Sequence, residues 1–327
     1  MPELPDQIPA AVLGEYGRPP EFSSFDAPPA PSEGQLLVEV EAAGLNPVDV
    51  ALGEQRYTVP SPPLPYVPGI EAVGRVAESA VPGIGAGERV YTDLPAVPYG
   101  TFAARTLAFG ATAFRIPDDA DPGLACALGI AGVAAHASIV HRARLQAGEH
   151  VVVLGATGVV GTVAVQVARL LGAGSIVAVG RDPGRLEATR GLGATATARI
   201  GEDDIEATIR EASGNGADVV IDMLCGPPAE AALEAMAIGG RLVQLGRSAA
   251  EMMEVKSGTV RGRTLSITGH TNMLTPPEIR HDAYRWLLER AMAGDLKVEV
   301  ETVPLAAVAD AWTRQKASPG HKLVLAP

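Results

Sequence analysis

Aromatic residues and cysteines are scarce in this chain of 327 residues. Phe, Trp and Tyr make up 4% of the sequence whereas hydrophobic residues make up 47%, so Ala, Val, Leu and Ile must pack the cores. The two cysteines, Cys126 and Cys225, lie far apart and form no CxxC motif. This argues against a disulfide framework and indicates a reducing cytoplasm, and neither cysteine is a strong candidate metal ligand.

Clusters of positive charge are also missing. The formal charge is −12, the pI is near 5.0, and Lys and Arg are scattered, which opposes binding to nucleic acid or to an anionic membrane. The start, MPELPDQIPA, does not resemble a signal peptide. The uncharged run 151–168 has the length of a membrane span, but glycines and threonines interrupt it in the manner of a strand, a turn and a helix. We therefore predict a cytoplasmic protein with no membrane or nucleic-acid partner.

The length predicts two domains with separate cores. The first third is rich in Pro and Gly and carries short β-type runs, such as 36–42, which is typical of an irregular, mostly β domain. From about residue 127, helices and strands alternate, which specifies a parallel, doubly wound sheet. The tail returns to β character and is expected to rejoin the first domain. The predicted fold class is α/β.

A glycine-containing turn follows the apolar run 150–154 and opens a helix expected over 162–171. Unpaired backbone amides and the positive dipole end of a helix favour a diphosphate at such a turn. One glycine lets the backbone approach the ligand, and the last lets helix and strand pack closely. The alternative is a tight structural turn. The turn comprises Ala156, Thr157, Gly158, Val159, Val160 and Gly161.

The end of the next strand indicates which cofactor binds. NAD-binding versions of this turn carry an acidic residue about twenty positions on, but this chain has Gly180 there, followed by Arg181 and, one helical turn later, Arg185. Arginines attract a 2′-phosphate and no carboxylate repels it, so NADPH is favoured over NADH. The alternative is that Arg181 is a solvated loop residue paired with Asp182.

Several ordered blocks resemble one family: EAAGLNPVDV, YVPGIEAVGRV, GERVY, YGTFAAR, ALGIAGVAAHAS, AGEHVVVLGATGVVGTVAVQVARLLGA and HKLVL. The chain from about Ala10 onward is similar to the quinone oxidoreductase branch of the medium-chain dehydrogenase/reductase superfamily. The resemblance implies a GroES-like catalytic domain over 1–126 and 276–327. It also implies a Rossmann domain over 127–275, with NADPH in the cleft between the two.

The same resemblance bears on zinc. Zinc-dependent cousins hold a catalytic metal through three ligands, and the corresponding positions here read Asn46, Ile70 and Ile130. Apolar side chains cannot coordinate zinc, and two cysteines cannot build the four-cysteine structural zinc lobe. Glu71, beside the lost ligand, is then expected to be structural. We predict that the chain has no metal site.

Without zinc to polarise a carbonyl, the substrate must already accept a hydride readily. Quinones and α,β-unsaturated carbonyl compounds do so, because negative charge spreads onto a distant oxygen, and the protein then needs hydrogen-bond donors and close positioning. Asn46 resembles the family's cleft asparagine, which binds the nicotinamide ribose or the substrate oxygen. Tyr57 matches the family's loop tyrosine. These two are the predicted catalytic residues, the alternatives being a turn role for Asn46 and packing for Tyr57.

Further cofactor contacts are implied by the resemblance alone. LVQLG and TGHTN resemble segments that border the nicotinamide, which assigns Leu245, Gly246, Gly269 and His270 to it, and Lys316 aligns with a basic residue that reaches the 2′-phosphate. Relatives commonly dimerise through an edge strand, here TLSITGHT, so a homodimer is expected. Two alternatives stay open: an enoyl-thioester reductase of the polyketide type, and an NADPH-binding protein without catalytic activity.

Overall fold

The structure is a computed structural model that describes residues 6–57 and 59–327. The chain divides into two compact units. Unit 1 combines the chain up to Ile130 with Val298–Pro327, and unit 2 comprises Ala131–Lys297. Residues 298–327 therefore belong to the first unit.

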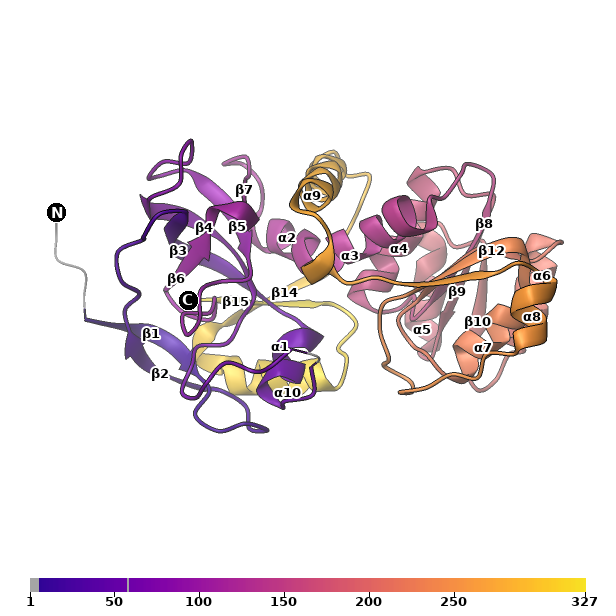
Figure 1. Cartoon of the computed structure of the whole chain (residues 1–327), viewed down its shortest axis with the longest axis horizontal. Coiled ribbons are helices and arrows are strands. Elements are labelled where there is room, and N and C mark those ends of the chain that lie inside the picture. Colours follow the sequence, from indigo (N-terminus) through magenta and orange to yellow (C-terminus); the bar gives the residue numbers. More distant parts are fainter. Residues whose placement is uncertain (1–5, 58) are drawn as a thin grey trace. The chain divides into compact units, whose positions relative to one another are not determined.

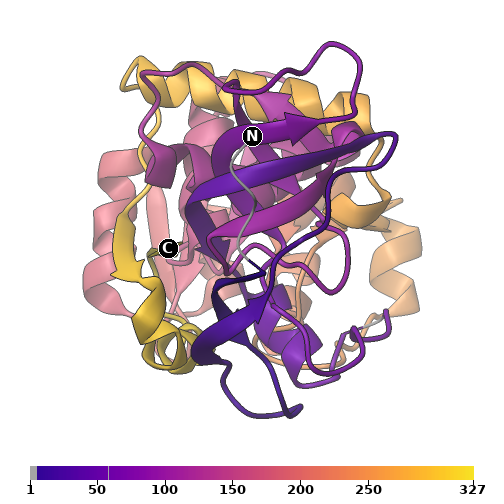
Figure 2. The same ribbon diagram turned by 90° about the vertical axis from the view of Figure 1, so that its left-hand side faces the viewer.

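Unit 1 is mostly β. Its larger sheet has the order β14-β15-β3-β4-β5-β7, with β6 paired to β3, and β1 and β2 form a separate antiparallel pair. The yellow C-terminal strand β15 lies beside β3 in this sheet (Figure 1). Figure 2 shows unit 1 facing the viewer. The strands are β1 (Gln7–Val12), β2 (Glu21–Asp26), β3 (Gln35–Leu45), β4 (Glu71–Ser79), β5 (Arg89–Asp93), β6 (Arg105–Phe109), β7 (Ala113–Arg115), β14 (Val300–Pro304) and β15 (Lys322–Ala326).

Three α-helices complete unit 1 in the described part of the chain: α1 (Pro47–Gly53), α2 (Pro122–Ala127) and α10 (Val308–Lys316). Helices α1 and α10 meet over Trp312, which is 1% exposed. A Cβ at Gly53 would lie 2.7 Å from the Trp312 ring, so only glycine permits this approach. Leu45 and Leu323 join the same core from the sheet.

Unit 2 is a parallel sheet with helices, as the alternating pattern predicted. The strand order is β10-β9-β8-β11-β12-β13, and all neighbours run parallel. The strands are β8 (His150–Leu154), β9 (Ser175–Gly180), β10 (Ala196–Arg199), β11 (Ala217–Asp222), β12 (Met236–Gln244) and β13 (Ser266–Gly269). The helices are α3 (Val133–Ala137), α4 (Val159–Leu170), α5 (Pro183–Ala188), α6 (Ile205–Ser213), α7 (Pro227–Glu234), α8 (Ser257–Gly262) and α9 (Pro277–Met292).

Small aliphatic residues fill the core of unit 2. Val152 and Val177 come from the central strands, and Ala229 and Ala232 come from α7. Short side chains let a helix lie close to a buried parallel sheet, which agrees with the low aromatic content. The α/β class is confirmed.

The second domain boundary differs from the expected one. Residues 276–297 were expected in the first domain, but α9 belongs to unit 2. The ring of Trp286 on α9 lies 4.9 Å from that of His136 on α3, and Leu287 is fully buried. Helix α9 thus contributes its apolar face to the core of unit 2, and the crossing back to unit 1 comes after it.

Two further details differ from the sequence pattern. The sequence pattern of residues 228–240 predicts one helix, but α7 ends at Glu234, because Met236 already pairs with Ala217 in the parallel sheet. Strand β10 and helix α6 were not predicted from the sequence. Strand β10 consists of the short segment ATAR, which gives a weak pattern.

The helical run Pro122–Ala143 is long and apolar enough to cross a membrane by length and composition. However, 78% of its apolar window is buried inside the protein. Such burial is typical of a core helix, so the run is weak support for a membrane span. The run 151–168 is divided between β8, a turn and α4.

Candidate functional site

The predicted phosphate-binding turn joins β8 to α4 in unit 2. β8 ends at Leu154, Gly155 has a positive φ of 87°, and α4 begins after its N-cap Gly158. A Cβ at Gly161 would overlap the backbone of Gly155 and Ala156, so glycine alone fits there. The first-turn amides of a helix have no partner within it. The turn therefore has the geometry that an anionic diphosphate requires.

Three arginines gather where β9 and β10 end. Arg181 and Arg185 are exposed, and Arg199 on β10 stands in register with Gly180 and donates from Nε to the Arg181 carbonyl at 3.1 Å. The Asp182 carboxylate, the alternative partner of Arg181, accepts the backbone N–H of Arg185 and caps α5. Arg199 was missed from the sequence because only the register of β10 brings it here.

The remaining predicted residues of unit 2 lie at the carboxyl ends of β12 and β13. Leu245 and Gly246 follow β12, and their backbone N–H groups donate to the Asp222 carbonyl at the end of β11. Gly269 ends β13, and the His270 N–H donates to the Gln244 carbonyl at 3.0 Å. All predicted cofactor residues of unit 2 thus follow the carboxyl ends of parallel strands, the edge at which open α/β sheets bind ligands.

Two buried polar side chains stand at this edge. The His270 ring is 7% exposed, its Nε2 lies 3.0 Å from Asn272 Oδ1, and burial lowers its pKa. The Asp222 carboxylate is fully buried and accepts the backbone N–H groups of Leu224 and Cys225 through Oδ1. Burial raises the pKa of Asp222. These hydrogen bonds show that the Asp222 carboxylate shapes the turn after β11.

In unit 1, Asn46 is 3% exposed and lies at the start of α1. Its Nδ2 donates to the Gly44 carbonyl at 3.1 Å and to Glu71 Oε1 at 2.8 Å. Its Oδ1 accepts from Lys322 Nζ at 2.6 Å. Both amide hydrogens are therefore engaged inside the protein, and the role of Asn46 toward a substrate stays a prediction.

Glu71 is the centre of this buried polar cluster. Its Oε1 also accepts from Lys322 Nζ at 2.5 Å, and its Oε2 accepts from the Tyr91 hydroxyl at 3.0 Å and from the Ile130 N–H at 2.6 Å. Glu71 is 0% exposed and Lys322 is 2% exposed. The sequence alone singled out neither Tyr91 nor Lys322. We call Asn46, Glu71, Tyr91 and Lys322 the Glu71 cluster.

Asp49 lies next to the Glu71 cluster. Its Oδ2 accepts the Asn46 N–H at 2.7 Å, so it braces the start of α1. Its Oδ1 is buried and has no hydrogen-bond partner within residues 6–57 and 59–327. Burial raises the pKa of Asp49 to about 7, although the Asn46 N–H and the Lys322 charge lower it.

The other two predicted residues of unit 1 are Tyr57 and Lys316. Tyr57 is half-buried after α1. Lys316, near the end of α10, forms an ion pair of 2.5 Å with Glu54 Oε1. Its predicted contact with the 2′-phosphate stays a prediction.

No group of three or more His, Cys, Asp or Glu side chains that could hold a metal ion is found in the part of the chain that the structure describes. At Ile130, one of the three positions that the resemblance assigns to a zinc ligand, the backbone N–H donates to the Glu71 carboxylate.

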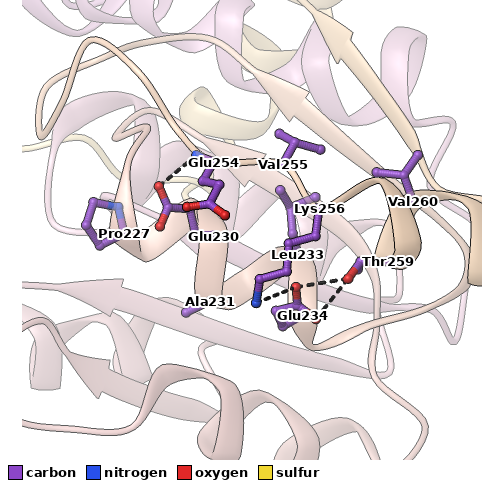
Figure 3. A pocket seen from close by; sticks show the side chains of 10 residues that line it. All are labelled: Pro227, Glu230, Ala231, Leu233, Glu234, Glu254, Val255, Lys256, Thr259 and Val260. Carbon is purple, nitrogen blue, oxygen red and sulfur yellow. Dashed lines mark hydrogen bonds and ion pairs between the residues drawn. The ribbon is translucent and has the colours of Figure 1, made fainter.

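A pocket of about 320 Å³ opens between α7 and the segment around α8 (Figure 3). Its polar lining includes Glu230, Glu234 and Glu254, and Lys256 Nζ lies 3.3 Å from Glu234 Oε1. None of the predicted cofactor residues lines it. An excess of carboxylates does not suit an anionic dinucleotide, so this pocket is not the expected cofactor site.

Comparisons with known proteins match both units. A family profile described as "Alcohol dehydrogenase GroES-like domain" matches residues 32–145, and one described as "Zinc-binding dehydrogenase" matches residues 159–289. A quinone oxidoreductase of Homo sapiens is 31% identical over 271 residues, which are 80% of this chain and 79% of that protein. The chain belongs to the quinone oxidoreductases of the medium-chain dehydrogenase/reductase superfamily.

Two other comparisons are informative. The chain is 33% identical, over 66% of its length, to 10% of a phenolphthiocerol/phthiocerol polyketide synthase protein of Mycobacterium tuberculosis. A solved mycobacterial structure, complexed with NADPH, superposes with a TM-score of 0.86 at 24% identity and covers 98% of this chain and 100% of that one. The latter likeness shows the fold, with a GroES-like unit 1 and a Rossmann-like unit 2.

Membership of the quinone oxidoreductase family makes the chain an oxidoreductase. The family also makes a small-molecule substrate the expected partner. The phosphate-binding turn could be found from the sequence because strand, glycines and helix are adjacent in the chain. The Glu71 cluster could not, because Lys322 and Glu71 are 251 residues apart.

Proposed function

We propose that this quinone oxidoreductase family member transfers a hydride from NADPH to a quinone or an α,β-unsaturated carbonyl compound without zinc. One observation carries the proposal. At the corner that the resemblance assigns to a catalytic metal, the Asn46 side chain is bound by Lys322 and Glu71, and the other two ligand positions are Ile70 and Ile130. The cation that contacts Asn46 there is an ammonium group of the protein itself.

The described residues fit NADPH. The glycine at 161 leaves room for a close approach of backbone to diphosphate, since any Cβ would overlap the turn. Arg181 and Arg185 supply positive charge at the end of β9, where a 2′-phosphate requires it. When bound, the cofactor supplies the hydride. The protein binds and orients the nucleotide through the turn and the arginines, and hydrogen bonds to the acceptor oxygen stabilise the charge that develops.

A substrate panel tests this function. The protein should oxidise NADPH with quinones or enals and react poorly with saturated aldehydes, because no metal polarises an isolated carbonyl. It should hold no stoichiometric zinc and keep its rate in a chelator. Preference for an enoyl thioester would favour the second candidate function, an enoyl-thioester reductase of the polyketide type, which the polyketide synthase match supports. Binding of NADPH without turnover of any acceptor would identify a non-catalytic binding protein and refute the proposal.

Replacing Arg181 by alanine tests the choice of cofactor. If its guanidinium pairs with the 2′-phosphate, Arg181→Ala should weaken NADPH binding by roughly ten- to hundredfold and leave NADH binding almost unchanged. Fluorescence titration with each nucleotide measures both constants, and Arg261→Ala, an exposed arginine on α8, is the matched control. Equal losses for the two nucleotides would show that Arg181 only supports the loop.

We also propose a cytoplasmic homodimer that joins two unit 2 sheets through β13. This strand is the last in the described sheet order, and all four of its residues are exposed. Ile267 on the strand is 37% exposed, and Leu274, in the short helix that follows it, is 80% exposed. An unpaired strand edge with apolar side chains can pair with a second copy. Light scattering of the purified protein measures its mass, and a monomer at micromolar concentration would contradict the dimer.

A further inference from the structure

We infer that Glu71 and Lys322 are positioning residues that hold the Asn46 carboxamide in one orientation, so that Asn46 can serve a bound molecule as a hydrogen-bond acceptor and not as a donor. The inference rests on the proposed function, because it takes Asn46 to contact the cofactor or substrate. It decides between two roles that the sequence left open: donation to the substrate oxygen, and a bond to a sugar hydroxyl of the nucleotide.

The contacts of Asn46 permit one orientation of its amide. The Nδ2 group faces two acceptors, the Gly44 carbonyl and Glu71 Oε1, whereas Oδ1 faces the Lys322 ammonium group. A flipped amide would place its oxygen against both acceptors and its NH₂ group against the ammonium group. Three favourable contacts would become three repulsive ones. The observed orientation uses both amide hydrogens and one of the two lone pairs of Oδ1.

Glu71 is fitted to this task as an acceptor of four hydrogen bonds. Asn46 and Lys322 donate to Oε1, and Tyr91 and the Ile130 N–H donate to Oε2. An ionised carboxylate accepts at both oxygens, whereas a glutamine would turn an NH₂ group toward one pair of donors. The surroundings are shaped to match, because a Cβ at Gly44 or Gly129 would overlap the Glu71 carboxylate.

Lys322 completes the arrangement from β15. Its ammonium group donates to Asn46 Oδ1 at 2.6 Å and to Glu71 Oε1 at 2.5 Å and is 2% exposed. It therefore neutralises the buried carboxylate and fixes the amide oxygen at the same time. The remaining lone pair of Asn46 suits a hydroxyl group, such as a ribose hydroxyl, and does not suit an oxygen that gains negative charge.

A double-mutant cycle on NADPH binding tests the inference, with the dissociation constant measured by fluorescence titration of the full-length protein. Asn46→Ala and Lys322→Met should each raise the dissociation constant by roughly three- to tenfold, the value of one hydrogen bond. The double variant should bind no more weakly than the weaker single variant, because Lys322 acts through Asn46. Lys322→Arg, which keeps the charge and the donors, should recover part of the affinity. Lys297→Met, an exposed lysine, is the control and should bind normally.

If the losses of the single variants multiply in the double variant, Lys322 acts independently of Asn46 and the inference fails. It also fails if Asn46→Ala binds NADPH normally. Should Lys322→Met not fold, the cycle is run with Lys322→Arg, which must then lose its effect in the Asn46→Ala background. Binding is measured without turnover, so absence of activity toward quinones and enones would refute the proposed function and leave this result readable.

Discussion

Lys322→Met is expected to lower the free energy of unfolding of unit 1 by about 3 to 5 kcal/mol, which is the usual cost of leaving a buried charge without its partner. Glu71 would keep its position at 0% exposure and lose the ammonium group that neutralises it. The hydrogen bonds from Tyr91 and Ile130 would remain, but neither brings a positive charge. The large effect follows from the removal of one partner and not from an intrinsic strength of the pair.

The measurement must separate the two units. The chain has two tryptophans, Trp286 in unit 2 and Trp312 in unit 1, so in a Trp286→Phe background the urea unfolding of unit 1 is followed through buried Trp312. Lys322→Met/Glu71→Gln should lose at least about 1 kcal/mol less than the sum of the two single variants, because the unpaired charge is gone. Exposed Lys297→Met is the control. A Lys322→Met variant as stable as this control would contradict the buried pair.

Asp49→Asn is expected to change how the stability of unit 1 depends on pH. Burial raises the pKa of Asp49 to about 7 from its ordinary 3.8, so between these values the folded carboxyl group holds a proton that the unfolded one releases. The contribution of this carboxyl group to the free energy of unfolding is fully present below pH 4 and is lost as the pH rises to 7. The loss amounts to about 4 kcal/mol at most, from 1.36 kcal/mol for each pKa unit. Asparagine keeps an oxygen for the Asn46 N–H and has no charge to bury.

The difference in unfolding free energy between Asp49→Asn and the wild type should therefore shift in favour of the variant from pH 4 to pH 8. The difference is the useful quantity, because other groups titrate in the same range. Burial lowers the pKa of His136 in unit 2 to about 4, and this group makes stability rise with pH where Asp49 makes it fall. A difference that stays constant from pH 4 to 8 would show that Asp49 is ionised in the folded protein throughout.

Much of the fold could be predicted because its signals are local. Alternating strands and helices gave the parallel sheet, and the phosphate-binding turn follows from a strand, glycines and a helix in direct succession. The exceptions are also physical. Strand β10 has the sequence ATAR, whose two alanines carry a weak strand signal, and Arg199 at its end was missed with it. Helix α9 was expected in the first domain, and its packing against α3 places it in unit 2.

The candidate site in unit 1 was only partly predictable. Asn46 was singled out through the resemblance to the family, and Glu71 was expected to be structural, which agrees with its four accepted hydrogen bonds. Lys322 is separated from Asn46 by 276 residues. In the sequence, nothing distinguishes this lysine of a terminal strand from an exposed one. Only the pairing of β15 with β3 brings its ammonium group to the Asn46 oxygen.

The path of the transferred hydrogen tests the central claim most directly. NADPH that carries deuterium at the transferred position of nicotinamide C4 is incubated with the protein and an enone, and the product is analysed by mass spectrometry and NMR. We expect the label at the β-carbon of the product, or a primary isotope effect when a quinone is the acceptor. Efficient turnover of saturated aldehydes or alcohols, together with indifference to enones and quinones, would contradict the account. It would place the chain's chemistry with that of the alcohol dehydrogenases.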